Sequence, residues 1–262
     1  LALLLPVHAA EKQNFTIAML LIGPEGDKLY HQQAKLDIDT LLSNRVSVEF
    51  RDIYISPGQE QHARAVISDL MTDPAVDCII GIGIEPSELL VRQKKYAKPT
   101  IAATILDRKL QGLPLNENGA SGIANFNYIQ SPFDLERDLA VFKTLYDFKH
   151  LGVLVPSGQT LMYSTIISYF GKAVQAVSPD AKLSFADVDT EHIDDSLDQL
   201  PEGVDSVYII PLFPEGQSEN EKKLIREINR RRLPSFALVG EEHVRMGALA
   251  SVAPERIFNA MT

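Results

Sequence analysis

The sequence predicts an α/β fold of two Rossmann-like lobes, each built around a parallel sheet. Three observations favour this fold. The 262 residues exceed the usual length of one domain. Short runs rich in Val and Ile alternate with longer segments of helical periodicity, which is the pattern of repeated βα units. The cycle occurs twice, before and after a turn-rich stretch at 106–121 that should precede the connection between the lobes.

The first set of elements fills an N-terminal lobe that we expect to span residues 11–121. Its apolar strand candidates lie at 16–22, 46–53, 77–83 and 100–104, and a further strand at 122–126 closes the set at the lobe boundary. Helices are predicted at 28–43, 59–71 and 87–96. Cys78 is the only cysteine, and its apolar surroundings predict a buried strand residue.

The second set fills a C-terminal lobe that we expect to span residues 122–250. Its strands are predicted at 151–155, 182–187, 206–210 and 235–239. Its helices are predicted from after Pro132 to Tyr146, at 160–176 and at 219–231. Residues 251–262 should begin a segment that returns to the N-terminal lobe, so the fold is expected to be truncated at its C-terminus.

The first ten residues predict the remnant of a secretory signal peptide. Five leading apolar residues are too few to span a bilayer, and Val7-His8-Ala9 provides small residues at a cleavage site. A disordered apolar leader is the alternative. Export would place the protein in the periplasm, and no cysteine follows the leader to accept a lipid anchor. We therefore expect a periplasmic protein that does not itself span the membrane.

The charge of the chain argues against nucleic acid as its main partner. The formal net charge of -10 repels polyanions. The basic run Arg230-Arg231-Arg232 falls at the end of a predicted helix, where cations complement the helix dipole. A polyanion-binding patch is the alternative reading of that run.

The candidate ligand-binding residues follow the predicted strands, because ligands of open parallel sheets bind outside the carboxyl ends of the strands. They are Gly23, Glu25, Glu85, Ser87, Ser157, Gln159, Thr160, Phe213 and Glu241. Hydroxyls at helix starts, as at Ser87, Ser157 and Thr160, suit carboxylate or phosphate oxygens, and plain helix capping is the alternative. Phe213 is expected to contact an apolar part of the ligand, and a loop residue that covers the core is the alternative. Glu241 suits an ammonium group or an acidic helix start.

Motifs for catalysis, cofactors and metals are missing from the sequence. Gly81 to Pro86 begins like a dinucleotide fingerprint, but Pro86 stands where the third glycine would allow close packing. The sequence contains no Walker loop, no Gly-x-Ser-x-Gly elbow and no His-Glu-x-x-His motif. Its six histidines are scattered. We therefore predict no catalytic residue, no cofactor and no metal site.

Three stretches carry a resemblance to a known family. Residues 233–251 contain Pro-x-Phe, then Gly-acidic, then Val-x-x-Gly-Ala-Leu-Ala, while 76–83 and 151–156 match two strands with their turns. In these motifs the chain resembles the substrate-binding proteins of ABC transporters of the tryptophan and tyrosine type. The resemblance covers nearly the whole chain. It implies the type I periplasmic binding protein fold, with two lobes joined by crossing segments.

The resemblance implies a binding protein and not an enzyme. A small molecule, such as an amino acid or a related compound, would enter an interlobe cleft, and the lobes would close by a hinge. An ABC permease in the inner membrane would recognise the closed form. The alternatives are a periplasmic ligand-sensing domain of a signalling protein and a two-lobed α/β enzyme such as a glycosyltransferase.

The chain departs from the family pattern at two turns. Ile84-Glu85 replaces a Thr in the family's Gly-Thr-Pro turn, and Pro211-Leu212-Phe213 replaces its Thr-Asp-Asn. The lost Asp is the kind of group that pairs an α-ammonium, and Glu85 or Glu241 is a candidate to replace it from another loop.

Overall fold

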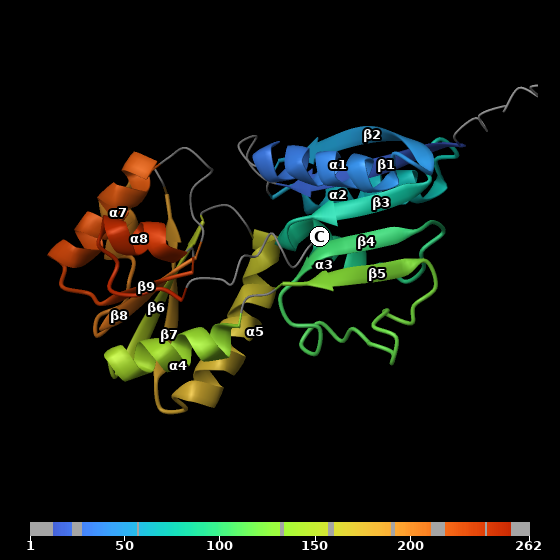
Figure 1. Cartoon of the computed structure of the whole chain (residues 1–262). Coiled ribbons are helices and arrows are strands. Elements are labelled where there is room, and N and C mark those ends of the chain that lie inside the picture. The colour runs from blue at the N-terminus through green and yellow to red at the C-terminus, as the bar shows by residue number, and fades with distance from the viewer. Residues whose placement is uncertain are drawn as a thin grey trace, which may run out of the picture.

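The computed structural model describes residues 13–22, 28–56, 58–131, 134–156, 160–189, 192–210, 218–238 and 240–252, without the side chains at 28–30, 156, 160–163 and 218. These residues form two lobes, each with a parallel sheet flanked by helices (Figure 1). The predicted α/β fold class is confirmed. The predicted signal-peptide remnant at 1–10 and residues 253–262 of the expected returning segment lie outside the described residues.

The first lobe is built on a sheet with the strand order β2-β1-β3-β4-β5, and every pair in it is parallel. Its strands are β1 (Gln13–Ile22), β2 (Val46–Ile55), β3 (Cys78–Ile82), β4 (Thr100–Ile105) and β5 (Phe126–Gln130). Its helices are α1 (Lys28–Leu42), α2 (Glu60–Thr72) and α3 (Ile84–Val91). In Figure 1 the strands of this sheet point toward the second lobe.

Strand β5 differs from the predicted lobe boundary. We expected a strand at 122–126 and a lobe that ends at 121, but β5 begins at Phe126 and pairs with β4. The first lobe therefore extends to Gln130. The Ser121 hydroxyl, which donates to the Phe126 carbonyl, ties the turn before β5 to the strand, so the turn-rich stretch is an internal loop of this lobe.

The second lobe has a sheet of order β7-β6-β8-β9, again with parallel pairs. Its strands are β6 (His150–Pro156), β7 (Lys182–Val188), β8 (Ser206–Ile209) and β9 (Ser235–Ala237). Its helices are α4 (Leu135–Leu145), α5 (Thr160–Val177), α6 (Ile193–Asp198), α7 (Ser218–Arg230) and α8 (Gly240–Met246). Sequence periodicity missed α6, because six residues are too few to establish a helical period.

The first sheet is covered on both faces, as β1 illustrates. Successive side chains of a strand point to opposite faces. Ala18 and Leu20 belong to the core cluster that holds residues of α2 and α3, whereas Met19 packs with residues of α1. Cys78 is buried in this second cluster, as predicted, and burial raises its pKa to about 11.

The second lobe has an aromatic core. Tyr208 on β8 stacks on Phe236 of β9 with ring centroids 5.3 Å apart. Phe142 of α4 packs on Phe236 at 5.5 Å and on Phe148 at 5.6 Å. All four side chains are fully buried. Such contacts between sheet and helix rings fix the position of α4, which follows the connection from the first lobe.

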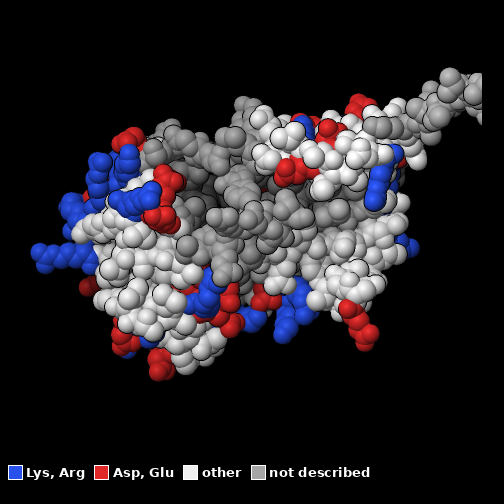
Figure 2. All heavy atoms as spheres, in the orientation of Figure 1, with Lys and Arg blue, Asp and Glu red and all other residues white. Residues whose placement is uncertain are grey.

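Two arginines of the basic run at the end of α7 form ion pairs within the second lobe. Figure 2 shows Lys and Arg side chains gathered at the outer end of the second lobe, over α7 and α8. Arg230 and Arg231 both pair with Glu227, and Arg231 also pairs with Asp198 at 2.7 Å. These pairs favour the structural explanation of the run over a polyanion patch. Among the described residues, none of the helices is long and apolar enough to cross a bilayer.

Candidate functional site

The strand orders place a topological switch point in each lobe. In the first sheet the order reverses between β1 and β3, and in the second between β6 and β8. Ligands of open α/β sheets bind in the crevice at the carboxyl ends of such strand pairs. Helix α3 follows β3 and helix α5 follows β6, and these two helices contact each other across the lobes. The two switch points therefore meet at the same boundary.

The turn from β3 into α3 is held rigidly at this boundary. Gly83 has φ 99°, a left-handed conformation that favours glycine, and its N–H donates to the Thr104 hydroxyl at 3.2 Å. The Ser87 hydroxyl donates to the Gly81 carbonyl at 3.3 Å and accepts from the Thr104 N–H at 3.0 Å. Ile84 packs against the cluster that contains the second lobe's core. The first turn of α3 is thus fixed to β3 and β4 and lies against the other lobe.

Glu85 lies in that first turn. Its side chain is only 2% exposed, and its Oε1 atom has no hydrogen-bond partner among the described residues. Burial raises the pKa of the Glu85 carboxyl, and the neighbouring carboxylate of Glu60, in the first turn of α2, raises it further. A buried carboxyl without a partner is costly in a folded protein, so this position is a candidate functional residue.

The structure describes only some of the other predicted ligand-binding residues. Gly23, Glu25, Ser157, Gln159 and Phe213 lie outside the described residues, and Thr160 begins α5 without a described side chain. Ser87 is fully buried, and its hydroxyl is used within the first lobe. Glu241 is exposed at the start of α8, where it pairs with Arg245 at 2.6 Å. Among the described side chains, Glu85 alone combines burial at the lobe boundary with a missing partner.

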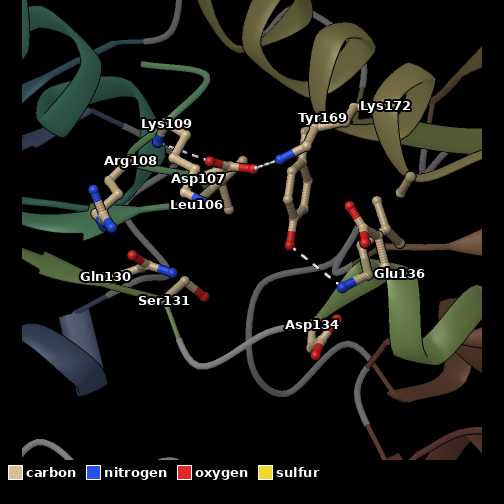
Figure 3. Close-up of a pocket in the computed structure, with 12 residues that line it drawn as sticks. Leu106, Asp107, Arg108, Lys109, Gln130, Ser131, Asp134, Glu136, Tyr169 and Lys172 are labelled. Atoms are coloured by element: carbon tan, nitrogen blue, oxygen red, sulfur yellow. Dashed lines mark hydrogen bonds and ion pairs between the residues drawn. The ribbon is translucent and has the colours of Figure 1, made fainter. Parts of the chain in front are cut away.

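A polar pocket of about 650 Å³ lies between the lobes (Figure 3). Its first-lobe wall comes from the loop after β4 and the end of β5, including Asp107 and Gln130. Its second-lobe wall comes from the start of α4 and from Tyr169 and Lys172 of α5. The pocket also borders the segment around Ser131 that connects the lobes. It therefore lies beside the connection between the two lobes.

One ion pair crosses this pocket. The Lys172 ammonium donates to the Asp107 carboxylate at 2.5 Å, and the backbone N–H groups of Lys109 and Leu110 donate to the same carboxylate. Burial opposes ionisation of Asp107, but these donors outweigh it and lower its pKa. The hydrogen bond to Asp107 raises the pKa of Lys172. Both groups are thus charged at neutral pH and link the lobes.

The Tyr169 phenol completes the second-lobe wall. It accepts the Leu135 N–H at 3.4 Å, which joins α5 to the start of α4, as Figure 3 shows. Burial raises the pKa of Tyr169 to about 12, so the phenol stays neutral. Sequence reasoning missed Asp107, Tyr169 and Lys172. The rule that selects loops after strands would have found Asp107 if it had been applied to β4, whereas two residues within a helix give no such signal.

We expect the Asp107–Lys172 pair to couple the lobes measurably. A double-mutant cycle with Asp107→Asn and Lys172→Met should give a coupling energy of about 0.5–1 kcal/mol in urea unfolding. The coupling should shrink in 1 M salt, because both groups are partly exposed and are screened. Additive effects of the two substitutions at low salt would contradict an interlobe link.

No metal site emerges from the part of the chain that the structure describes. No group of three or more His, Cys, Asp or Glu side chains there could hold a metal ion.

No protein-family model matches the chain, and no curated protein matches it. Solved structures do. An ABC domain from Streptococcus pneumonia in complex with L-Trp is 17% identical with a TM-score of 0.58, over 92% of this chain and 80% of that one. A periplasmic binding protein type 1 from Bordetella pertussis is 15% identical with a TM-score of 0.53, over 87% and 62%. A protein assigned to the LacI transcriptional regulators, from Bacteroides fragilis, is 14% identical with a TM-score of 0.55, over 95% and 89%.

These similarities define the architecture. The chain has the two-lobed fold of type I periplasmic binding proteins, as the sequence resemblance implied. The same fold occurs in binding proteins and in a regulator, so the role of this chain has to be argued from its site.

Proposed function

We propose that this protein is a periplasmic substrate-binding protein of an ABC importer, which binds a small molecule between its lobes and presents it to a permease. The observation that carries the proposal is the meeting of the two switch points. Helices α3 and α5, which follow a switch-point strand in each lobe, touch across the boundary. Ligand bound there contacts both lobes at once, which is what couples binding to closure.

Closure follows from differential affinity. The ligand shifts the equilibrium toward the closed form only as far as it binds that form better. We assign the hinge to the connection between the lobes near Ser131, which lines the same pocket as Asp107 and Lys172. The proposed contacts are Glu85 from the first lobe with Gly23 and Glu25, and Ser157, Gln159, Thr160 and Phe213 from the second. We assign Ser87 to the support of the α3 turn.

A ligand-sensing domain is the second candidate function. The similarity to a LacI-type regulator favours it, since that protein shares the fold over most of both chains. Both candidates bind a small molecule without chemical turnover. They differ in the partner of the closed form, which is a permease in one case and a signalling domain in the other.

A thermal-shift screen of the full-length mature protein tests the binding role. Amino acids, amines, sugars and aromatic acids are added in turn, because the L-Trp complex of one structural neighbour makes amino acids a natural first class. A compound at a hundredfold excess over its Kd should stabilise the fold by about 2.7 kcal/mol and raise the Tm by several degrees. No shift with any class would contradict the proposal. Loss of uptake of the stabilising compound in a deletion strain would favour importer over sensor.

A further inference from the structure

Glu85 is a buried acid for which the described residues provide no cationic partner. The residue is 2% exposed, and its Oε1 atom lacks a partner among the described residues. The charged group that perturbs it is Glu60, which is also acidic. Burial and the negative charge of Glu60 both disfavour a negative charge on Glu85.

The arginines of α2 and α3 already form ion pairs with other carboxylates. Arg64 pairs with Glu60 within α2 through two donors. Arg92 pairs with Glu88 within α3 at 3.0 Å, and Gln111 donates to the other oxygen of Glu88 at 2.8 Å. Glu88 therefore has the partners that Glu85 lacks, although both side chains are buried on the same helix.

The position of Glu85 argues against a purely structural role. It follows β3, one of the two strands at the first switch point, and its neighbour Ile84 packs against the cluster of the second lobe. A buried carboxyl that stabilised the lobe would have a donor, as Glu88 does. An acid kept without one at a ligand-binding edge is suited to a partner that arrives with the ligand.

We propose that Glu85 is the counter-ion for a positively charged nitrogen of the ligand, so that the ligand is a protonated amine. This inference rests on the proposed binding function and specifies its ligand class. The ammonium group donates to Glu85, and the acidic character of this position disfavours a carboxylate or phosphate at this end of the site. A neutral sugar would leave the buried acid uncompensated.

Titration calorimetry with matched variants tests the assignment. The probes are protonated amines, namely amino acids, diamines and tryptamine, together with myo-inositol and 4-hydroxybenzoate as neutral and anionic counterparts. Wild type should bind at least one amine, and Glu85→Gln should weaken that binding roughly 30-fold or more, because it removes one partner of a buried charge pair. Glu88→Gln is the control, since its carboxylate is used inside the lobe, and it should keep wild-type affinity.

A second readout uses wild type alone and does not depend on how a variant folds. Burial raises the pKa of Glu85, so at pH values near that raised pKa a proton must leave the carboxyl before an ammonium group can bind. Calorimetry in two buffers should show proton release with the amine, and the affinity should rise with pH until Glu85 is ionised.

The outcomes separate this inference from the proposed function. Binding of a neutral or anionic probe with equal affinity in wild type and Glu85→Gln overturns the amine assignment and leaves the binding role intact. Amine binding that is insensitive to Glu85→Gln and releases no proton also overturns it. A wild-type protein that binds none of the probe classes contradicts the binding role itself, and the amine assignment with it.

Discussion

Phe236→Ala should lower the free energy of unfolding of the second lobe by about 3–5 kcal/mol. Phe236 is fully buried on β9, and its ring contacts Tyr208 and Phe142. Removing the ring leaves a cavity between the sheet and α4 that neither neighbour can fill without leaving its own position. Urea unfolding followed by circular dichroism measures the loss.

Ile167→Ala on α5 is the matched control for that substitution. Ile167 is 43% exposed, so its truncation should change the free energy of unfolding by about 0.5 kcal/mol or less. If Phe236→Ala were equally mild, the aromatic core would not be the element that holds the second lobe together.

Glu85→Gln should stabilise the ligand-free protein by about 1–3 kcal/mol at pH 8. The substitution replaces a buried carboxylate that lacks a partner by a neutral amide of the same shape. A residue that costs stability without ligand and provides affinity with ligand is typical of a binding site. Thermal unfolding of both proteins without ligand, compared from pH 4.5 to pH 8, measures the effect.

The sign of the pH dependence follows from the raised pKa of Glu85. The folded state holds this proton more tightly than the unfolded chain. The stability that the proton contributes is therefore present below the ordinary glutamate range and is lost as the pH rises through the raised pKa. Asp138 and Asp187 also have pKa values raised by burial, but they occur in both proteins and cancel in the difference. The advantage of Glu85→Gln should grow with pH.

Glu88→Gln provides the opposite result. It removes a carboxylate that accepts from Arg92 and Gln111, so it should destabilise the protein at pH 8. If Glu85→Gln were also destabilising at pH 8, Glu85 would have a cationic partner inside the protein, and the argument for an arriving ammonium group would fail.

The lobes and most strands were predictable because the sequence pattern that indicates each of them lies within the segment itself. The apolar run around Cys78 and the repeated βα pattern needed no knowledge of distant residues, and both lobes follow from them. The lobe boundary was not predictable in the same way. Strand β5 belongs to the first lobe because it pairs with β4. The turn-rich stretch between the two strands suggested a lobe boundary there, and the sequence pattern does not show which strands pair.

The site was predictable only where the chain order places a residue after a strand. That rule selected Glu85, our proposed counter-ion, but it did not reveal that the side chain is buried without a partner, because burial depends on residues far away in the sequence. It left the Ser87 hydroxyl open between ligand oxygens and helix capping, and the structure uses it to join β3, α3 and β4. Asp107 and Lys172 are 65 positions apart, and only the folded chain brings them together.

The most direct test of the central claim is the distance between the lobes during binding. Cysteines introduced at exposed Gln61 on α2 and Lys223 on α7 can carry a fluorophore pair, because the natural Cys78 is buried with its pKa raised to about 11 and does not compete for label. Energy transfer should rise as the stabilising amine is added, with the midpoint at its Kd, and should not respond at the same concentrations in Glu85→Gln. Saturable binding with no change in transfer would contradict a ligand-closed, two-lobed binding protein.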